Sequence, residues 1–253
     1  MSDILITGGT GKTGRRIASR LGTRARIAAR STGFDWDDES TWAFDGVRAA
    51  YLAYAPDLAV PGSPEIVGRF AIRAALAGVE RLVLLAGRGE PRVEPAITAV
   101  RASGVPTTVL ACAFFCQNFS EGLLAPQDGV IAFPAGEVAE PFIHCDDIAD
   151  VAVAALTDPR HDGETYELTG PTPITFAEAA AALAEAWGRP VRYAAVTPEA
   201  YAELLAPHLP PLEIAFLVKL FRTLLDGHNA YAADGVARAL GRAPRAFAAY
   251  AAA

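Results

Sequence analysis

Three glycines spaced three residues apart mark the segment with the clearest chemical potential. Gly8, Gly11 and Gly14 follow a short apolar run at residues 4–6 and lead into a segment with helical character. This spacing lets the chain turn, lets the backbone approach a diphosphate and lets the helix lie close to the strand. Free N–H groups at the start of the helix would hold that diphosphate. The predicted dinucleotide-binding turn consists of Thr7, Gly8, Gly9, Thr10, Gly11, Lys12, Thr13 and Gly14.

A phosphate-transfer site of the P-loop class is the alternative for this segment, because Gly11, Lys12 and Thr13 also have the order that ends a P-loop. A P-loop needs a glycine five residues before Gly11, and Ile6 stands there instead. An aspartate that would hold magnesium at the end of a later apolar strand is also missing. The pattern therefore favours dinucleotide binding over nucleotide hydrolysis.

The end of the second expected strand indicates which dinucleotide is bound. Arg30 and Ser31 stand where an acidic residue would bind the ribose hydroxyls of NAD. An arginine can instead pair with the 2′-phosphate of NADP. We therefore expect NADP(H) as the cofactor, and NAD(H) is the alternative if Arg30 is only a surface arginine.

The elements that would position these residues alternate along the first half of the chain. Short apolar runs predict strands and longer segments between them predict helices, which is the pattern of a parallel sheet. The fold class is therefore α/β, a Rossmann-type doubly wound parallel sheet. The expected strands are residues 4–6, 25–29, 50–54, 81–85 and 107–110, and the expected helices are residues 13–21, 63–77 and 95–103.

After about residue 110 the pattern changes to isolated strands and alanine-rich helices. We expect a Rossmann core at residues 1–112 with return segments near 140–170, and a smaller C-terminal α/β substrate lobe at 113–253 interleaved with it. The apolar helix at 211–225 is expected to be buried in this lobe, and closure over a substrate or a dimer contact is its alternative. Further elements are strands at 142–144 and 191–196 and helices at 148–156 and 175–187, the last starting with the capping box of Thr175 and Glu178.

Composition argues against several other classes of protein. The formal charge is −7 without a basic block, so nucleic acid is not expected as a partner. The chain has no basic leader and no apolar stretch long enough to cross a bilayer, so we expect a cytoplasmic protein without membrane contact. We expect a monomer or homodimer. Cys112, Cys116 and Cys145 form no CxxC pair, which argues against disulfides and a metal site.

Several motifs follow one another in a fixed order along the chain. They are the glycine turn, Arg30 with Ser31, and the segments 34–42, 84–90, 114–119, 141–149, 166–171 and 241–247. Together they resemble the NmrA-like atypical short-chain dehydrogenase/reductase family over nearly the whole chain. The run at 34–42, Phe-Asp-Trp-Asp-Asp-Glu-Ser-Thr-Trp, is most similar to the branch that contains the ergot-alkaloid reductases. The resemblance implies an NAD(P)H-dependent oxidoreductase, such as an imine reductase of secondary metabolism.

The resemblance also implies which residues would surround the cofactor. Arg30 and Ser31 would lie at the adenosine phosphate, and Asp35 and Trp36 near the adenine. The residues that would border the nicotinamide side follow the third and fourth expected strands, where open parallel sheets bind their ligands. They are Ala53, Tyr54, Ala55, Pro56, Ala86, Gly87 and Arg88.

No catalytic acid is evident in the sequence. Ordinary short-chain dehydrogenases protonate the substrate with a tyrosine placed four residues before a lysine, but Gly8 precedes Lys12 and Ala215 precedes Lys219 at that spacing. Hydride addition to an iminium or to a quinone-like acceptor needs little general acid, so we expect such an activated acceptor. The missing pair also fits an alternative, a non-catalytic regulator that senses the redox state of the dinucleotide through a protein partner.

Aromatic and polar side chains after the fifth expected strand favour an enzyme with a small-molecule substrate. An aromatic box suits an aromatic or cationic substrate. Burial in the core is the alternative for Phe114 and Phe115, and a structural role is the alternative for His144. The predicted substrate-binding residues are Tyr54, Phe114, Phe115, Gln117, Asn118 and His144.

Overall fold

The computed structural model describes residues 3–252, and the chain divides into two compact units. Unit 1 comprises Met1–Cys112, Cys145–Leu168 and Asp234–Arg242. Unit 2 comprises Ala113–His144, Thr169–Ala233 and Ala243–Ala253. The chain thus returns to unit 1 twice, and the sequence pattern gave no indication of the second return.

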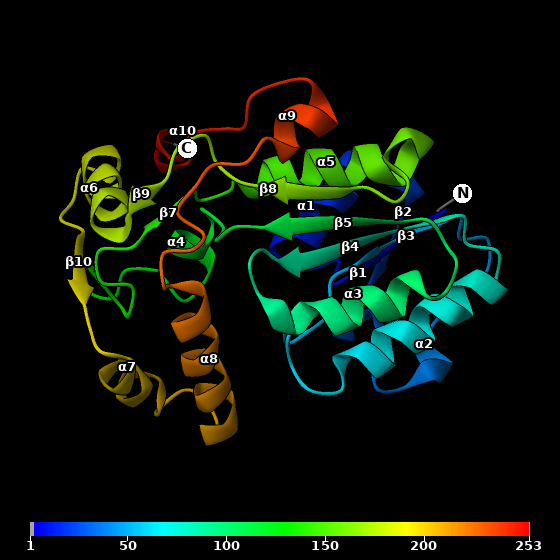
Figure 1. Ribbon diagram of the computed structural model, residues 1–253, viewed down its shortest axis with the longest axis horizontal. Helices are drawn as coiled ribbons and strands as arrows, with labels where there is room; N and C mark the ends of the chain where they lie inside the picture. The colour runs from blue at the N-terminus through cyan, green and yellow to red at the C-terminus, as the bar shows by residue number, and fades with distance from the viewer. Residues whose placement is uncertain (1–2, 253) are drawn as a thin grey trace. The chain divides into compact units, whose positions relative to one another are not determined.

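Unit 1 is built on one sheet of six strands in the order β2-β1-β3-β4-β5-β8 (Figure 1). Every neighbouring pair is parallel, so all six carboxyl ends lie along one edge of the sheet. The order reverses between β1 and β3, which is where sheets of this kind bind their ligands. The predicted α/β class with a doubly wound parallel sheet is confirmed. The strands are β1 (Ile4–Thr7), β2 (Ala25–Ala28), β3 (Ala49–Leu52), β4 (Arg81–Gly87), β5 (Thr107–Cys112) and β8 (Thr165–Leu168).

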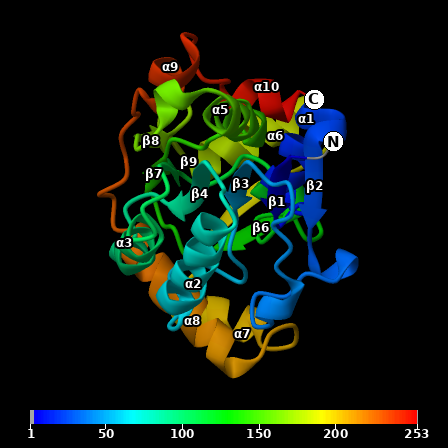
Figure 2. The same ribbon diagram turned by 90° about the vertical axis from the view of Figure 1, so that its right-hand side faces the viewer.

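Helices cover both faces of this sheet. On one face α1 (Lys12–Leu21) packs beside α5 (Cys145–Thr157), and on the other α2 (Ser63–Leu76) packs beside α3 (Glu94–Arg101), as Figure 2 shows. Strands β1 and β3 are therefore buried at every residue, which explains their uninterrupted apolar runs. The short helix α9 (Gly235–Leu240), from the second return, packs against β8 and α5.

Unit 2 is organised around a core of phenylalanine side chains. Phe119, Phe133, Phe142 and Phe176 are all at most 2% exposed. The capping box predicted at the start of α6 is present, because Glu178 N donates to Thr175 Oγ1 and Thr175 N donates to Glu178 Oε2. The elements are α4 (Asn118–Glu121), β6 (Val130–Phe133), β7 (Ala139–Glu140), β9 (Ile174–Thr175), α6 (Phe176–Trp187), β10 (Arg192–Ala195), α7 (Pro198–Leu205), α8 (Pro211–Leu224) and α10 (Phe247–Ala251).

The structure lacks one expected strand and contains four strands that were not expected, β6, β7, β8 and β9. The strand expected at 142–144 is wrong, because only Ile143 pairs there, in a single bridge with Phe115. The apolar run instead reflects a buried Phe142 ring, and α5 already begins at Cys145. Strand β8 was missed because it lies at the edge of the sheet, where its alternating burial produces no apolar run.

Candidate active site

The glycine turn leaves the start of α1 open to an anionic group. Gly8 has φ +62° and its carbonyl oxygen accepts a hydrogen bond from Gly11 N at 2.9 Å. A Cβ at Gly14 would lie 2.2 Å from Gly8 O and 2.7 Å from Gly9 Cα, so only glycine allows this close approach of helix and turn. Helix α1 begins after Gly11, with neither a side-chain cap nor an acidic residue in its first turn. Its positive end therefore fits a diphosphate.

Buried hydrogen bonds connect this turn and the start of α1 to β3 and the residue that follows it. Thr7 Oγ1 donates to Tyr51 O at 3.0 Å and accepts from Ala53 N at 2.9 Å. The Tyr51 hydroxyl donates to Thr13 Oγ1 at 2.9 Å, in the first turn of α1. Thr7 and Tyr51 are fully buried and Thr13 is nearly so. Tyr51, which the sequence analysis did not select, thus links β3 directly to the predicted diphosphate-binding segment.

Replacing Tyr51 by phenylalanine is expected to weaken binding of the predicted dinucleotide about 3- to 10-fold, because Thr13 loses its anchor on β3. Stability should fall by about 1–3 kcal/mol, the usual effect of leaving a buried hydrogen-bonding group without its partner. The matched control is Tyr166→Phe, since the Tyr166 hydroxyl bonds a different buried group, His161 Nδ1, at 2.8 Å. Fluorescence titration with NADPH and urea unfolding measure both effects. Equal losses of affinity in the two variants would contradict the role given to Tyr51.

Arg30 and Ser31 lie in a short 3₁₀ turn, η2 (Arg30–Thr32), directly after β2. Both side chains are exposed. Among residues 3–252, no carboxylate forms an ion pair with Arg30. The guanidinium is therefore available to an external phosphate, as the predicted contact with a 2′-phosphate requires.

The resemblance depended most on the segment 34–42, and the aromatic side chains of this segment pack against Phe70 of α2. Trp36 is only 8% exposed, and its ring centroid lies 5.0 Å from that of Phe70 and 5.2 Å from that of Tyr54. Trp42 Nε1 donates to Asp35 O at 2.8 Å, which closes the loop. Asp35 itself is exposed. Trp36, predicted to lie near the adenine, is thus in ring contact with Tyr54, predicted to lie near the nicotinamide.

The two segments predicted to border the nicotinamide share the carboxyl edge of the sheet. Residues 53–56 follow β3, and Ala86 and Gly87 are the last residues of the neighbouring strand β4. The sequence pattern ended β4 two residues too early. Arg88 is 4% exposed, and its Nε donates to Glu167 Oε2 on β8 at 2.8 Å. Its guanidinium is therefore held inside unit 1.

The other predicted substrate residues, apart from Tyr54 in unit 1, belong to unit 2. Gln117 Nε2 lies 3.1 Å from His144 Nε2, and both side chains are buried. Phe114 is partly buried against the aromatic core, with its centroid 6.2 Å from those of Phe133 and Phe176. Core packing, the alternative for Phe114, accounts for these contacts. Phe115 and Asn118 are partly exposed.

A charged group at the carboxyl edge of the sheet went unnoticed in the sequence. Glu90 and Arg92 follow β4, and Asp57 follows β3. Arg92 Nε and Nη2 donate to the two carboxylate oxygens of Glu90, each at 2.8 Å. Glu90 is only 3% exposed. Nothing in the spacing of these residues indicated that the Asp57 carboxyl would feel the charges of Glu90 and Arg92.

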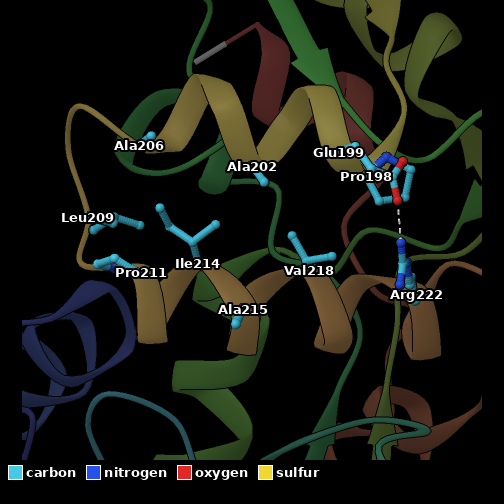
Figure 3. A pocket seen from close by; sticks show the side chains of 10 residues that line it. All are labelled: Pro198, Glu199, Ala202, Ala206, Leu209, Pro211, Ile214, Ala215, Val218 and Arg222. Atoms are coloured by element: carbon cyan, nitrogen blue, oxygen red, sulfur yellow. Dashed lines mark hydrogen bonds and ion pairs between the residues drawn. The ribbon is translucent and has the colours of Figure 1, made fainter.

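Unit 2 also contains a groove of about 480 Å³ between α7 and α8 (Figure 3). Its walls are apolar, with Ala202 on α7 and Ala206 just after this helix facing Ile214 and Val218 on α8. The ion pair of Glu199 with Arg222 lies at one end. None of the predicted site residues lines it. Helix α8 buries Ile214, Leu220 and Phe221 in the unit 2 core, as expected, and leaves Leu212 83% exposed.

Other chemistries find little support in the described part of the chain. Residues 3–252 contain no cluster of ligands for a metal ion and no helix long and apolar enough to span a membrane. The three cysteines are buried, and none of them forms a disulfide. Burial raises the pKa of the Cys112 thiol well above its usual range, which disfavours the thiolate form that a nucleophile needs.

The chain matches known proteins over almost its whole length. It is 34% identical to an uncharacterized oxidoreductase, YesF, of Bacillus subtilis (strain 168), across 99% of this chain and 94% of that protein. It is 32% identical to agroclavine dehydrogenase of Claviceps fusiformis, across 97% and 94%. It is 31% identical to an NAD(P)H azoreductase of Xenophilus azovorans, across 98% and 96%. No protein-family model matches the sequence.

Solved structures of reductases share the fold. The NADPH-dependent quinone oxidoreductase QOR2 of Escherichia coli, complexed with NADPH, has a TM-score of 0.78 at 20% identity over 98% of each chain. The triphenylmethane reductase of Citrobacter sp., complexed with NADP(H), has a TM-score of 0.76 at 22% identity over 96% of each chain. At these identities the likeness establishes the fold alone.

Proposed function

Since this chain belongs to the NmrA-like reductase family that includes the ergot-alkaloid reductases, we propose that it is an NADPH-dependent oxidoreductase. The observation that carries the proposal is the uncapped start of α1 behind a turn that only glycine permits at position 14. Its relatives named as an NAD(P)H azoreductase and as agroclavine dehydrogenase support the same class of reaction. Bound NADPH would supply a hydride.

The residues of unit 1 would bind and orient this cofactor. Main-chain N–H groups between Thr7 and Gly14 would hold the diphosphate, and Arg30 would pair with the 2′-phosphate and so favour NADPH over NADH. Residues 53–56 and 86–88 would border the nicotinamide at the carboxyl edge of the sheet. The predicted residues of unit 2, including Gln117 and His144, would contact the substrate.

The acceptor would be an activated small molecule, an iminium or imine or a quinone-like conjugated system. The absence of a tyrosine four residues before Lys12 or Lys219 supports this choice, because a simple ketone needs a strong proton donor as its alkoxide develops. The quinone oxidoreductase is named for an acceptor of the quinone kind, and the NAD(P)H azoreductase is named for the reduction of azo compounds, which are also conjugated acceptors.

Steady-state assays with three acceptor panels test the proposal. Purified protein is given NADPH with cyclic iminium compounds, with quinones or with simple ketones, and NADPH consumption is followed. We expect turnover of iminium compounds or quinones to exceed that of ketones. Faster turnover of ketones would contradict the choice of acceptor, and tight NADPH binding without consumption by any panel would favour a redox sensor instead.

A further inference from the structure

The loops after β3 and β4 place the carboxyl group of Asp57 where the charges of Glu90 and Arg92 act on it. Asp57 lies one residue beyond the segment 53–56, and Glu90 and Arg92 lie just beyond the segment 86–88. Because β3 and β4 are parallel neighbours, both loops leave the same edge of the sheet. The proposed function places the nicotinamide at this same edge. A side chain there that can release a proton would be in a position to act in place of the missing tyrosine.

The guanidinium of Arg92 is engaged by Glu90 through two bonds of 2.8 Å, and Glu90 Oε1 also accepts from Arg92 N at 2.9 Å. Asp57 has no such partner. Within residues 3–252 its carboxyl group makes a single hydrogen bond, in which Oδ1 accepts from Ala59 N at 2.8 Å. Atom Oδ2 is therefore available to carry a proton.

The surroundings of Asp57 favour its protonated form. Burial raises the pKa of the Asp57 carboxyl, the amide of Ala59 opposes the rise, the negative charge of Glu90 adds to it, and the positive charge of Arg92 opposes it. The net direction is upward, toward the range in which a carboxylic acid can donate a proton near neutral pH.

Two tyrosines nearby are poorer donors. Tyr51 is fully buried and its hydroxyl is already bonded to Thr13. Tyr54 follows β3, and burial, with the negative charge of Asp37 as a smaller cause, raises the pKa of its hydroxyl. A tyrosine whose pKa is raised donates less readily than an ordinary one.

We propose that Asp57 is the proton donor of the reaction and that the acceptor belongs to the quinone-like class, whose reduction takes up a proton. The inference rests on the proposed function. As the acceptor gains the two electrons of the hydride, an electron pair on its carbonyl oxygen forms a bond to the Asp57 proton and the O–H bond of Asp57 breaks. Asp57 is left as a carboxylate and regains a proton from water. An iminium gains hydride alone and would not need this group.

Asp57→Asn is the test variant because the amide oxygen can still accept from Ala59 N while the acid is lost. We expect kcat with a quinone to fall about 10-fold, less than the loss of about 100-fold or more that follows where a general acid is essential, because a quinone-like acceptor needs only weak acid assistance, and we expect the Kd for NADPH to stay unchanged. In wild type, kcat should fall as pH rises through the pKa of Asp57, and the variant should lack this step. Carboxyl signals in NMR spectra of the cofactor-free protein should show a group of raised pKa that Asp57→Asn removes.

Asp158→Asn is the matched control, since Asp158 Oδ1 accepts from Arg160 N at 3.0 Å in a similar turn before β8. It should leave kcat unchanged. If wild type reduces quinones and Asp57→Asn does so equally fast, or if Tyr54→Phe removes the pH step instead, the inference is overturned while the proposed function stands. If wild type does not consume NADPH with any of the acceptors, the proposed function itself fails.

Discussion

Replacement of Gly14 by alanine is expected to reduce NADPH affinity about 100-fold or more, equivalent to about 2.8 kcal/mol. The added Cβ would lie 2.2 Å from Gly8 O and 2.8 Å from Gly8 C, and both are backbone atoms that cannot rotate away. Helix α1 must then move off the turn, which misaligns the N–H groups that would hold the diphosphate. Calorimetric titration with NADPH measures the loss.

The control for this substitution is Gly22→Ala at the other end of α1. Gly22 has φ +57°, so alanine is strained there, but no atom lies within 4 Å of its added Cβ. We expect Gly22→Ala to lower stability modestly and to leave NADPH affinity unchanged. NADPH affinity of Gly14→Ala within a few-fold of wild type, in a protein that is still folded by circular dichroism, would contradict the geometry assigned to the turn.

Replacement of Arg30 by alanine is expected to lower NADPH affinity about 10- to 100-fold and to leave NADH affinity nearly unchanged. The reason is that an exposed guanidinium after β2, with no carboxylate paired to it within residues 3–252, would be the group that meets the 2′-phosphate. The comparison variant is Arg48→Ala, whose guanidinium forms an exposed ion pair with Glu80. Parallel titrations with both dinucleotides give the ratio. A ratio unchanged by Arg30→Ala would remove the expected preference for NADPH.

The glycine turn and the positions of the first five strands in the sequence could be predicted because each depends on local sequence. Gly8, Gly11 and Gly14 lie within one turn, and the buried strands β1 and β3 appear as uninterrupted apolar runs. The capping box at Thr175 and Glu178 is equally local. These features carry their own signal, so no knowledge of distant contacts was needed.

The features that were missed depend on contacts between residues far apart in the chain. The bond from Tyr51 to Thr13 spans 38 positions, and the pair of Arg88 with Glu167 spans 79. The charge of Glu90 acts on the Asp57 carboxyl across loops that follow β3 and β4, which are neighbours in the sheet. Strand β8 has the alternating burial of an edge strand, which a short window does not separate from a loop.

A direct titration of the purified wild-type protein with NADPH tests most simply whether the turn from Thr7 to Gly14 binds a dinucleotide. We expect saturable binding of one NADPH per chain with a Kd of about 1 µM or below, and a much weaker signal for Gly14→Ala. Lack of saturable binding of both NADPH and NADH to the folded wild-type protein would contradict the assignment of this turn, and with it the proposed reductase activity.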